Sequence, residues 1–283
     1  MRVIVFAAVF LVSCASGGRP SAEAPSAAPI IAAEREFAAD AAVRGWAAAF
    51  RSWAASDAIT LSPDPINAQE NLAQVPGNGE TTLDWRPAYA GVSQSGDFGF
   101  TTGPFQIRGR EGILGHYFTV WRRQRDGSWK WIFDAGTDVR DPGPAVATDA
   151  DIPTLPVALE SSGSADAAIA EVSAIEAQIA SGGAVRSEAL SRRLAHNARV
   201  NRPGAPPALD RSAAVALVLA DGGVGYRALR QDAASSGDMV FTLGEVRDQH
   251  EGAERLRYYA RIWQRRPEGW RVVFDEIVPR RGP

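Results

Sequence analysis

Two residues of one short stretch, His116 and Asp134, are of the side-chain types that move protons in enzymes. The stretch reads HYFTVWRRQRDGSWKWIFDAG and spans residues 116–136. A carboxylate can take a proton from the carbon beside a carbonyl group, and a neutral donor can stabilise the enolate that forms. With Asp134 as the base and His116 or a tyrosine as the donor, the stretch would suit an isomerase or a cyclase.

Three aromatic residues are candidates for binding the ligand of such a site. Trp85, Tyr89 and Tyr117 each combine a flat apolar ring with a polar group, which suits contact with an apolar ligand. Within the stretch itself, alternate residues of a regular strand face opposite sides, so only one of two sets lines a cavity. The first set is Trp129, Trp131 and Phe133, and the second is Lys130, Ile132 and Asp134.

A second version of the stretch, YYARIWQRRPEGWRVVFDEIV, begins at Tyr258. Its Trp263, Trp270, Phe274 and Asp275 repeat Trp121, Trp129, Phe133 and Asp134 in the same order. Asp134 recurs as Asp275 among different neighbours. The repeat therefore favours a structural role for Asp134, in which its carboxylate holds the end of a strand, and not a role as a general base. His116 is not clearly repeated, so a function specific to the first half would involve this residue.

Both halves order their elements in the same way, with helices before strands. Predicted helices span residues 30–56 and 67–74 in the first half, and 165–180, 185–200 and 210–219 in the second. Predicted strands span residues 82–93, 98–108, 114–125, 129–137, 225–233, 239–247, 255–265 and 270–278, and the segment DAITLSPDP adds a short one. Helices followed by an antiparallel meander predict the α+β class in each half.

The N-terminus carries the features of an export signal. Arg2 precedes an apolar run, Val3 to Val12, that is too short to span a bilayer and fits the core of a signal peptide. Leu11 to Cys14 resembles the lipobox of bacterial lipoproteins, in which the cysteine is lipidated. We therefore expect a lipid anchor at Cys14 and a place in the bacterial cell envelope, on the periplasmic face of the outer membrane.

Composition divides the chain into five segments. They are a lipoprotein signal peptide at 1–14, a flexible tether at 15–29, a first domain at 30–140, a linker at 141–160 and a diverged second domain at 161–283. Cys14 is the only cysteine, so once it is lipidated we expect no disulfide, no cysteine nucleophile and no cysteine-based metal site.

The first half resembles the SnoaL-like, domain of unknown function 4440 branch of the nuclear transport factor 2-like superfamily. The matching positions are Glu36 and Phe37, Trp85 and Pro87, Ser95 to Asp97, Tyr117 and Trp121, and Gly127 to Asp134. Residues 165–278 resemble the same family less strongly, through a second Ser-Gly-Asp turn and the tryptophan strands. The resemblance implies two cystatin-like, cone-shaped rolls, each with helices packed on a curved antiparallel sheet and a mouth that holds a small apolar ligand. It also implies pairing through the sheets, as an intrachain pseudo-dimer or as a homodimer.

Charge and motif content argue against several function classes. The net charge of -3 gives no general attraction to nucleic acid, and His116, His196 and His250 lack the spacing of a metal site. We therefore expect no metal, no cofactor and no nucleic-acid partner. The leading hypothesis is a non-catalytic module that binds a small ligand or assembles at the envelope. The alternative is an isomerase- or cyclase-like enzyme with its carboxylate base, Asp134, in the cavity of the first domain.

Overall fold

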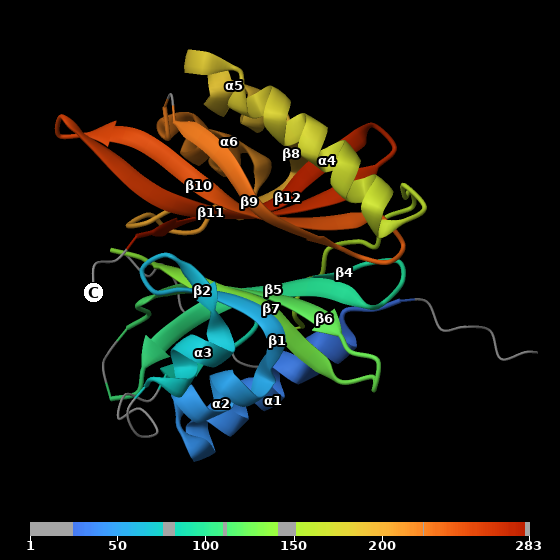
Figure 1. Ribbon diagram of the computed structural model, residues 1–283, viewed down its shortest axis with the longest axis vertical. Coiled ribbons are helices and arrows are strands. Elements are labelled where there is room, and N and C mark those ends of the chain that lie inside the picture. The colour runs from blue at the N-terminus through green and yellow to red at the C-terminus, as the bar shows by residue number, and fades with distance from the viewer. Residues whose placement is uncertain (1–24, 76–82, 110–111, 141–150, 223, 281–283) are drawn as a thin grey trace, which may run out of the picture.

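The computed structural model describes residues 25–75, 83–109, 112–140, 151–222 and 224–280. In each of two domains, helices cover one face of a curved sheet, and the other face is turned to the neighbouring domain (Figure 1). The predicted α+β class is confirmed, with two rolls that each pack helices on one curved sheet. The predicted signal peptide with Cys14, most of the tether and the first half of the linker lie outside the described residues.

The first domain begins with two helices because Gly45, at a φ of 89°, ends α1 (Ala28–Arg44) and starts α2 (Trp46–Trp53) in a new direction. Its other elements are β1 (Ala54–Leu61), β2 (Pro65–Asn67), α3 (Ala68–Ala73), β3 (Leu83–Trp85), β4 (Tyr89–Val92), β5 (Phe98–Ile107), β6 (Gly115–Arg123) and β7 (Trp129–Asp138). The sheet order is β2-β1-β7-β6-β5-β3, and β4 also pairs with β5. All pairs are antiparallel except β1 with β7, which run parallel.

The second domain repeats this plan with one sheet of five strands in the order β8-β12-β11-β10-β9. Its elements are α4 (Ala165–Ala180), the 3-10 turn η1 (Gly183–Val185), α5 (Arg186–Ser191), β8 (Leu194–Asn201), α6 (Arg211–Ala220), β9 (Gly225–Ala233), β10 (Met239–His250), β11 (Ala253–Arg266) and β12 (Gly269–Pro279). The helix predicted at 185–200 is therefore wrong in its second half. Parallel pairing of β8 with β12 overrides the local helix preference of this alanine-rich segment.

A β-bulge in β7 overturns the predicted alternation of side chains. Val120 pairs with Phe133 and Trp121 pairs with Trp131, which leaves Ile132 as the extra residue. As a result Trp131 faces the helices, where its indole N–H donates to the Phe50 carbonyl at 3.1 Å. Asp134 faces the same side, whereas the ring of Phe133 faces the second domain. Regular alternation predicted that Trp131 and Phe133 share one face and that Asp134 lies on the other. The bulge instead puts Trp131 and Asp134 on one face and Phe133 on the other.

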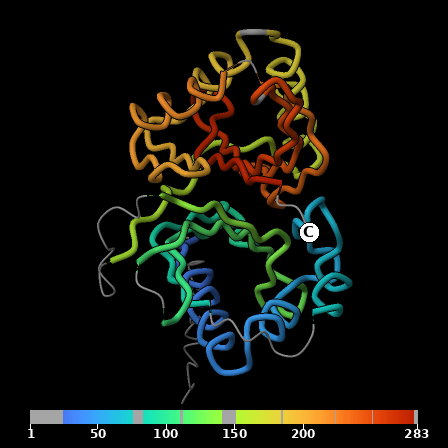
Figure 2. The backbone as a smooth tube through the Cα atoms, turned by 90° about the vertical axis from the view of Figure 1, so that its left-hand side faces the viewer, coloured from blue at the N-terminus to red at the C-terminus, as the bar shows by residue number. Residues whose placement is uncertain are grey.

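Figure 2 shows the second domain stacked on the first. The two sheets contact each other through aromatic rings and through their Ser-Gly-Asp turns. Phe118 stacks on Phe274 with ring centroids 4.2 Å apart and planes at 16°. At one end of the junction, the hydroxyls of Ser95 and Ser236 lie 2.9 Å apart. Near them, Asp238 accepts a hydrogen bond from a backbone N–H of the first-domain turn, and Asp97 does the same for the second. The turn residues that repeat in sequence therefore contact one another in space.

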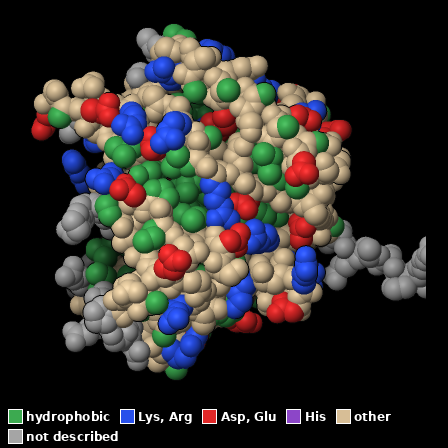
Figure 3. Space-filling model, in the orientation of Figure 1, with side chains coloured by type: hydrophobic (Ala, Val, Ile, Leu, Met, Phe, Trp, Pro, Cys, Tyr) green, Lys and Arg blue, Asp and Glu red, His purple; other side chains and the backbone are tan. Residues whose placement is uncertain are grey.

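Charged side chains cross the same junction, and acidic and basic groups lie side by side there on the face seen in Figure 3. Arg122 pairs with Asp57 of its own domain and with Asp232 of the other. Arg230 pairs with the same two aspartates from the opposite side. These partly exposed pairs add modest stability and fix the register of one domain on the other.

The described half of the predicted linker runs along the junction. The Leu155 N–H donates to the Ala90 carbonyl at 2.8 Å, and the Pro156 carbonyl accepts from the Gln264 side chain at 2.9 Å. This segment therefore bonds to both sheets. No helix within the described residues is long and apolar enough to cross a membrane.

Candidate functional site

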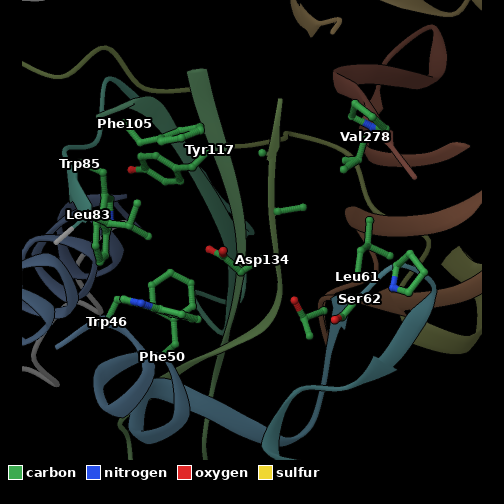
Figure 4. A pocket seen from close by; sticks show the side chains of 15 residues that line it. Trp46, Phe50, Leu61, Ser62, Leu83, Trp85, Phe105, Tyr117, Asp134 and Val278 are labelled. Atoms are coloured by element: carbon green, nitrogen blue, oxygen red, sulfur yellow. The ribbon is translucent and has the colours of Figure 1, made fainter. Parts of the chain in front are cut away.

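The first domain holds a cavity of about 410 Å³ between its helices, the concave face of its sheet and the end of the second domain (Figure 4). Most of its lining is aromatic or aliphatic. The lining residues are Trp46, Phe50, Thr60, Leu61, Ser62, Pro63, Leu83, Trp85, Phe105, Tyr117, Asp134, Ala135, Gly136, Val278 and Pro279. Among these described residues there is no arginine or lysine, so the cavity suits a neutral ligand with a large apolar body.

Asp134 is the only carboxyl group of the described lining, and Figure 4 shows it pointing into the cavity from β7. The Thr119 hydroxyl on the neighbouring strand donates to Asp134 Oδ2 at 2.6 Å. Burial raises the pKa of Asp134 to about 8, against the lowering effect of Thr119, and the negative charge of Glu34 raises it further. The group therefore titrates close to neutral pH, where it can both give and take a proton.

Glu34 of α1 lies behind the cavity and has an exposed fraction of 0%. It accepts hydrogen bonds from the indole N–H groups of Trp85 at 2.6 Å and Trp121 at 3.1 Å, and from the Thr101 hydroxyl. Burial raises its pKa to about 6 although these hydrogen bonds lower it. The first domain thus carries one fully buried carboxyl group, Glu34, and one half-buried carboxyl group, Asp134, and neither forms an ion pair within the described residues.

Glu34 was not predicted from sequence, where the early glutamate of the family pattern was placed at Glu36; the structure shows Glu36 exposed and Glu34 buried. The signal that would have found it is helical spacing. Glu34 precedes the fully buried Phe37 by three residues, so both point from α1 to the sheet. Glu36 does not share that face.

The second domain places the same two carboxylates around an arginine. Glu176 of α4 accepts from the Trp263 indole at 3.0 Å, as Glu34 does from Trp121. Arg261 pairs with Asp275 across β11 and β12, at the register position where Thr119 pairs with Asp134. Its guanidinium, with an exposed fraction of 0%, lies 2.6 Å from Asp275 and 3.0 Å from Glu176.

A second arginine, Arg202, lies 2.6 Å from Asp275. Burial alone would raise the pKa of Asp275, but Arg261 and Arg202 outweigh it and hold the pKa below its usual value. Asp275 is therefore an ionised, structural carboxylate, as its recurrence in the sequence suggested. Asp134 occupies the equivalent position without either arginine, so the two copies of one residue have opposite electrostatics.

The structure brings together three of the residues chosen from sequence. Trp85, Tyr117 and Asp134 line the cavity together. The Tyr117 hydroxyl is buried and makes no hydrogen bond within the described residues. Burial, with the nearby carboxylates, raises the pKa of Tyr117 well above its usual range, so it stays a neutral donor. The ring lines the cavity, while the hydroxyl has almost no accessible surface.

His116 and Tyr89 do not line the cavity. His116 neighbours Tyr117 on β6 and so points to the opposite face of the sheet. Burial lowers the pKa of His116 to about 4, which keeps it uncharged. Tyr89 lies under the guanidinium of Arg199 from β8, 3.9 Å from its ring centroid, and packs between the domains. The predicted site with Asp134 as base and His116 as donor is therefore wrong, because the two side chains lie on opposite faces of the sheet.

No cluster of potential metal ligands occurs among the described residues. Cys14, the predicted lipidation site, lies outside them.

Comparison with known proteins gives structural likeness only. No family model matches the chain, and no curated protein matches it significantly. A nuclear transport factor 2-like protein of unknown function from Pseudomonas putida is similar over 41% of this chain and 89% of its own, with 16% identity and a TM-score of 0.35. A nuclear transport factor 2-like protein with a cystatin-like fold from Novosphingobium aromaticivorans is similar over 41% and 83%, with 22% identity and a TM-score of 0.31. A domain of unknown function with a cystatin-like fold from Nostoc punctiforme is similar over 41% and 79%, with 14% identity and a TM-score of 0.34.

Proposed function

We propose that the first domain binds a small neutral molecule in its cavity and transfers a proton to or from it through Asp134, as an isomerase- or cyclase-like enzyme does. The observation that carries this proposal is the environment of Asp134. Its carboxyl group faces an apolar cavity, is held by Thr119, and has a pKa of about 8. A group with a pKa near the working pH is the most effective proton carrier.

The roles of the cavity residues follow from their donors and acceptors. After a small movement that exposes its buried, unpartnered hydroxyl, Tyr117 donates a hydrogen bond to the carbonyl oxygen of the ligand and stabilises the negative charge that develops there. Asp134 in its ionised form takes a proton from the neighbouring carbon and returns it to another position. With a pKa of about 8, roughly one molecule in ten carries this ionised form at pH 7. Trp85 and the other aromatic walls hold the apolar body of the ligand.

A non-catalytic ligand-binding module is the second candidate, and it was the leading hypothesis from sequence. The observation in its favour is that Asp134 is mostly protonated at neutral pH. A protonated carboxyl and the Tyr117 phenol would then act as two hydrogen-bond donors to one ligand oxygen. Both candidates use the same cavity and differ only in whether a proton leaves the ligand.

Deuterium exchange separates the two candidates without knowledge of the natural ligand. The protein without residues 1–24 is mixed in D2O with a panel of neutral cyclic ketones, and loss of the α-proton signals is followed by NMR. We expect exchange to be faster with the wild-type protein than with Asp134→Asn, and unchanged in the control Asp151→Asn, which alters an exposed aspartate. Ketone binding without faster exchange would establish the ligand-binding module instead.

We also propose that the chain belongs to the SnoaL-like, domain of unknown function 4440 branch and is an exported lipoprotein of the outer membrane. The family motifs and the Leu11 to Cys14 segment support this. In a Gram-negative host, the wild-type protein should partition into the detergent phase of a Triton X-114 extract. Cys14→Ser should move it to the aqueous phase, and an equal distribution of both proteins would contradict the lipid anchor.

A further inference from the structure

Two residues that line the first-domain cavity belong to the second domain. Val278 and Pro279 lie at the end of β12, and Figure 4 shows Val278 on the side of the cavity where Leu61 and Ser62 of the first domain also lie. Val278 is 5% exposed, so this edge of the wall is packed rather than loose. The cavity is therefore incomplete without the end of the second domain.

One exposed carboxylate of the first domain contacts this part of the wall. Asp64, in the turn between β1 and β2, accepts hydrogen bonds from Arg280 Nε at 2.6 Å and Nη2 at 2.8 Å. It also accepts one from the Tyr258 hydroxyl at 2.5 Å. Arg280 directly follows Pro279, and Tyr258 is the β-sheet partner of Val278. Asp64 thus contacts the residue that follows Pro279 and the strand beside Val278, and we call Asp64, Arg280 and Tyr258 the Asp64 clamp.

The interior of the second domain shows why its role would differ from that of the first. Arg261 and Arg202 occupy the space beside Asp275 with ion pairs to buried carboxylates. Four of the ten residues that line the pocket beside Arg202 are arginines, and each of these arginines already has a carboxylate partner. The second copy has therefore kept the sheet and filled the region that corresponds to the Asp134 site.

We infer that the second domain completes the ligand site of the first, with Val278 and Pro279 as specificity-determining residues and the Asp64 clamp as the device that positions them. This inference rests on the proposed function of the cavity as a binding site. Because Val278 presents methyl groups to the cavity, it sets how large an apolar ligand fits beside it. Asp64, Arg280 and Tyr258 act through the position of the strand end and are positioning residues.

The first test changes the size of the wall. Binding of cyclohexanone, cyclooctanone, cyclodecanone and cyclododecanone to the full two-domain protein is measured by ligand-observed NMR. Val278→Ala removes two methyl groups, so we expect the preference for a larger over a smaller ring to rise about tenfold. The matched control is Val246→Ala, a buried valine of β10 that does not line the cavity, and it should leave the preference unchanged. An unchanged preference in a folded Val278→Ala protein would overturn the inference.

The second test needs no ligand, so it separates failure of the inference from failure of the proposed function. The pKa of Asp134 is measured by carbon NMR in the wild type, in Asp64→Ala and in the control Glu268→Ala, which breaks an exposed ion pair remote from the cavity. Loosening the clamp should admit water and lower the pKa of Asp134, while the control should not change it. If no ketone binds but the pKa of Asp134 falls in Asp64→Ala, the second domain does close the cavity and the proposed ligand binding is wrong. If ketones bind and the pKa is the same in all three proteins, the second domain does not close the site.

Discussion

Replacement of Asp134 by asparagine should stabilise this protein at neutral pH. Asparagine has nearly the same shape as aspartic acid and keeps an oxygen that accepts the hydrogen bond from Thr119. It differs in having no proton to lose. The variant therefore removes one titration and little else.

The direction of the pKa shift decides whether this titration raises or lowers the free energy of unfolding as the pH increases. The pKa of Asp134 is raised from 3.8 to about 8 by burial, so the folded protein holds this proton more tightly than the unfolded chain. Stability is then greatest below pH 3.8 and falls as the pH rises toward 8. Between pH 4 and 7 the loss covers three pH units at about 1.4 kcal/mol each, so the free energy of unfolding falls by up to about 4 kcal/mol. Asp134→Asn should regain that amount at pH 7 and nothing at pH 4.

The equivalent substitution in the second domain should have the opposite effect. Asp275 is fully buried between Arg261 and Arg202, which lower its pKa. Asparagine there removes the carboxylate that both buried arginines share and leaves Arg261 with Glu176 alone and Arg202 with Asp221 alone. Breaking a buried ion pair costs up to about 3 to 5 kcal/mol. Asp275→Asn is therefore a matched control for Asp134→Asn, because it makes the same substitution at the equivalent position of the other domain.

Urea unfolding at pH 4 and pH 7 measures these differences. Tryptophan fluorescence and circular dichroism should give one coincident transition, which is required before free energies are compared in a chain of two domains. We expect Asp134→Asn to be the most stable of the three proteins at pH 7 and Asp275→Asn the least. If Asp134→Asn is instead less stable than the wild type at pH 7, then Asp134 is ionised and stabilised in the folded protein. The proton-transfer role would then lose its basis.

Three further predictions concern single side chains. Thr119→Arg would reproduce the second-domain arrangement, so the pKa of Asp134 measured by NMR should fall below its usual value and ketone binding should be lost. Phe118→Ala removes the ring that stacks on Phe274 between the sheets and should lower the free energy of unfolding by about 3 to 5 kcal/mol, which urea titration would detect. His116 is kept neutral by burial, with a pKa lowered from 6.5 to about 4, so stability present above pH 6.5 is lost as the pH falls toward 4. His116→Gln should remove this part of the acid sensitivity, about 3 kcal/mol, in unfolding experiments at pH 7 and 4.5.

Local sequence chemistry predicted the parts of this fold that depend on neighbours along the chain. The Ser-Gly-Asp turns and the paired tryptophan strands recur in both halves because glycine and short polar residues fix tight turns wherever they occur. The segment after α5 was assigned wrongly because β8 forms by pairing with β12, which lies more than seventy residues later in the chain. Helical spacing places Glu34 on the buried face of α1, but the partner of its carboxylate, Trp121, is 87 residues away, so this contact could not be predicted locally. No local pattern contains information of this kind.

The bulge at Ile132 shows how one residue decides whether the candidate site exists. On a regular strand Trp131 and Asp134 would face opposite sides of the sheet. The extra residue places both on the concave face, where the Trp131 indole is bonded to α2 and Asp134 enters the cavity. The second domain has a bulge at the same place, between the pairs Ile262 with Phe274 and Trp263 with Val272. Backbone geometry is thus equal in the two copies and cannot explain why their carboxylates differ.

The difference lies in one cross-strand neighbour, and the repeat does show it. The Tyr-x-x-x-Trp strand reads Tyr117, Thr119 and Trp121 in the first copy and Tyr259, Arg261 and Trp263 in the second. A hydroxyl beside a buried carboxyl leaves it without a counter-charge, whereas a guanidinium ionises it and fills the space around it. A recurring aspartate therefore does not argue against function in both copies. It marks a fold position that becomes a structural ion pair, or under the proposed function a proton-transfer site, according to the residue opposite.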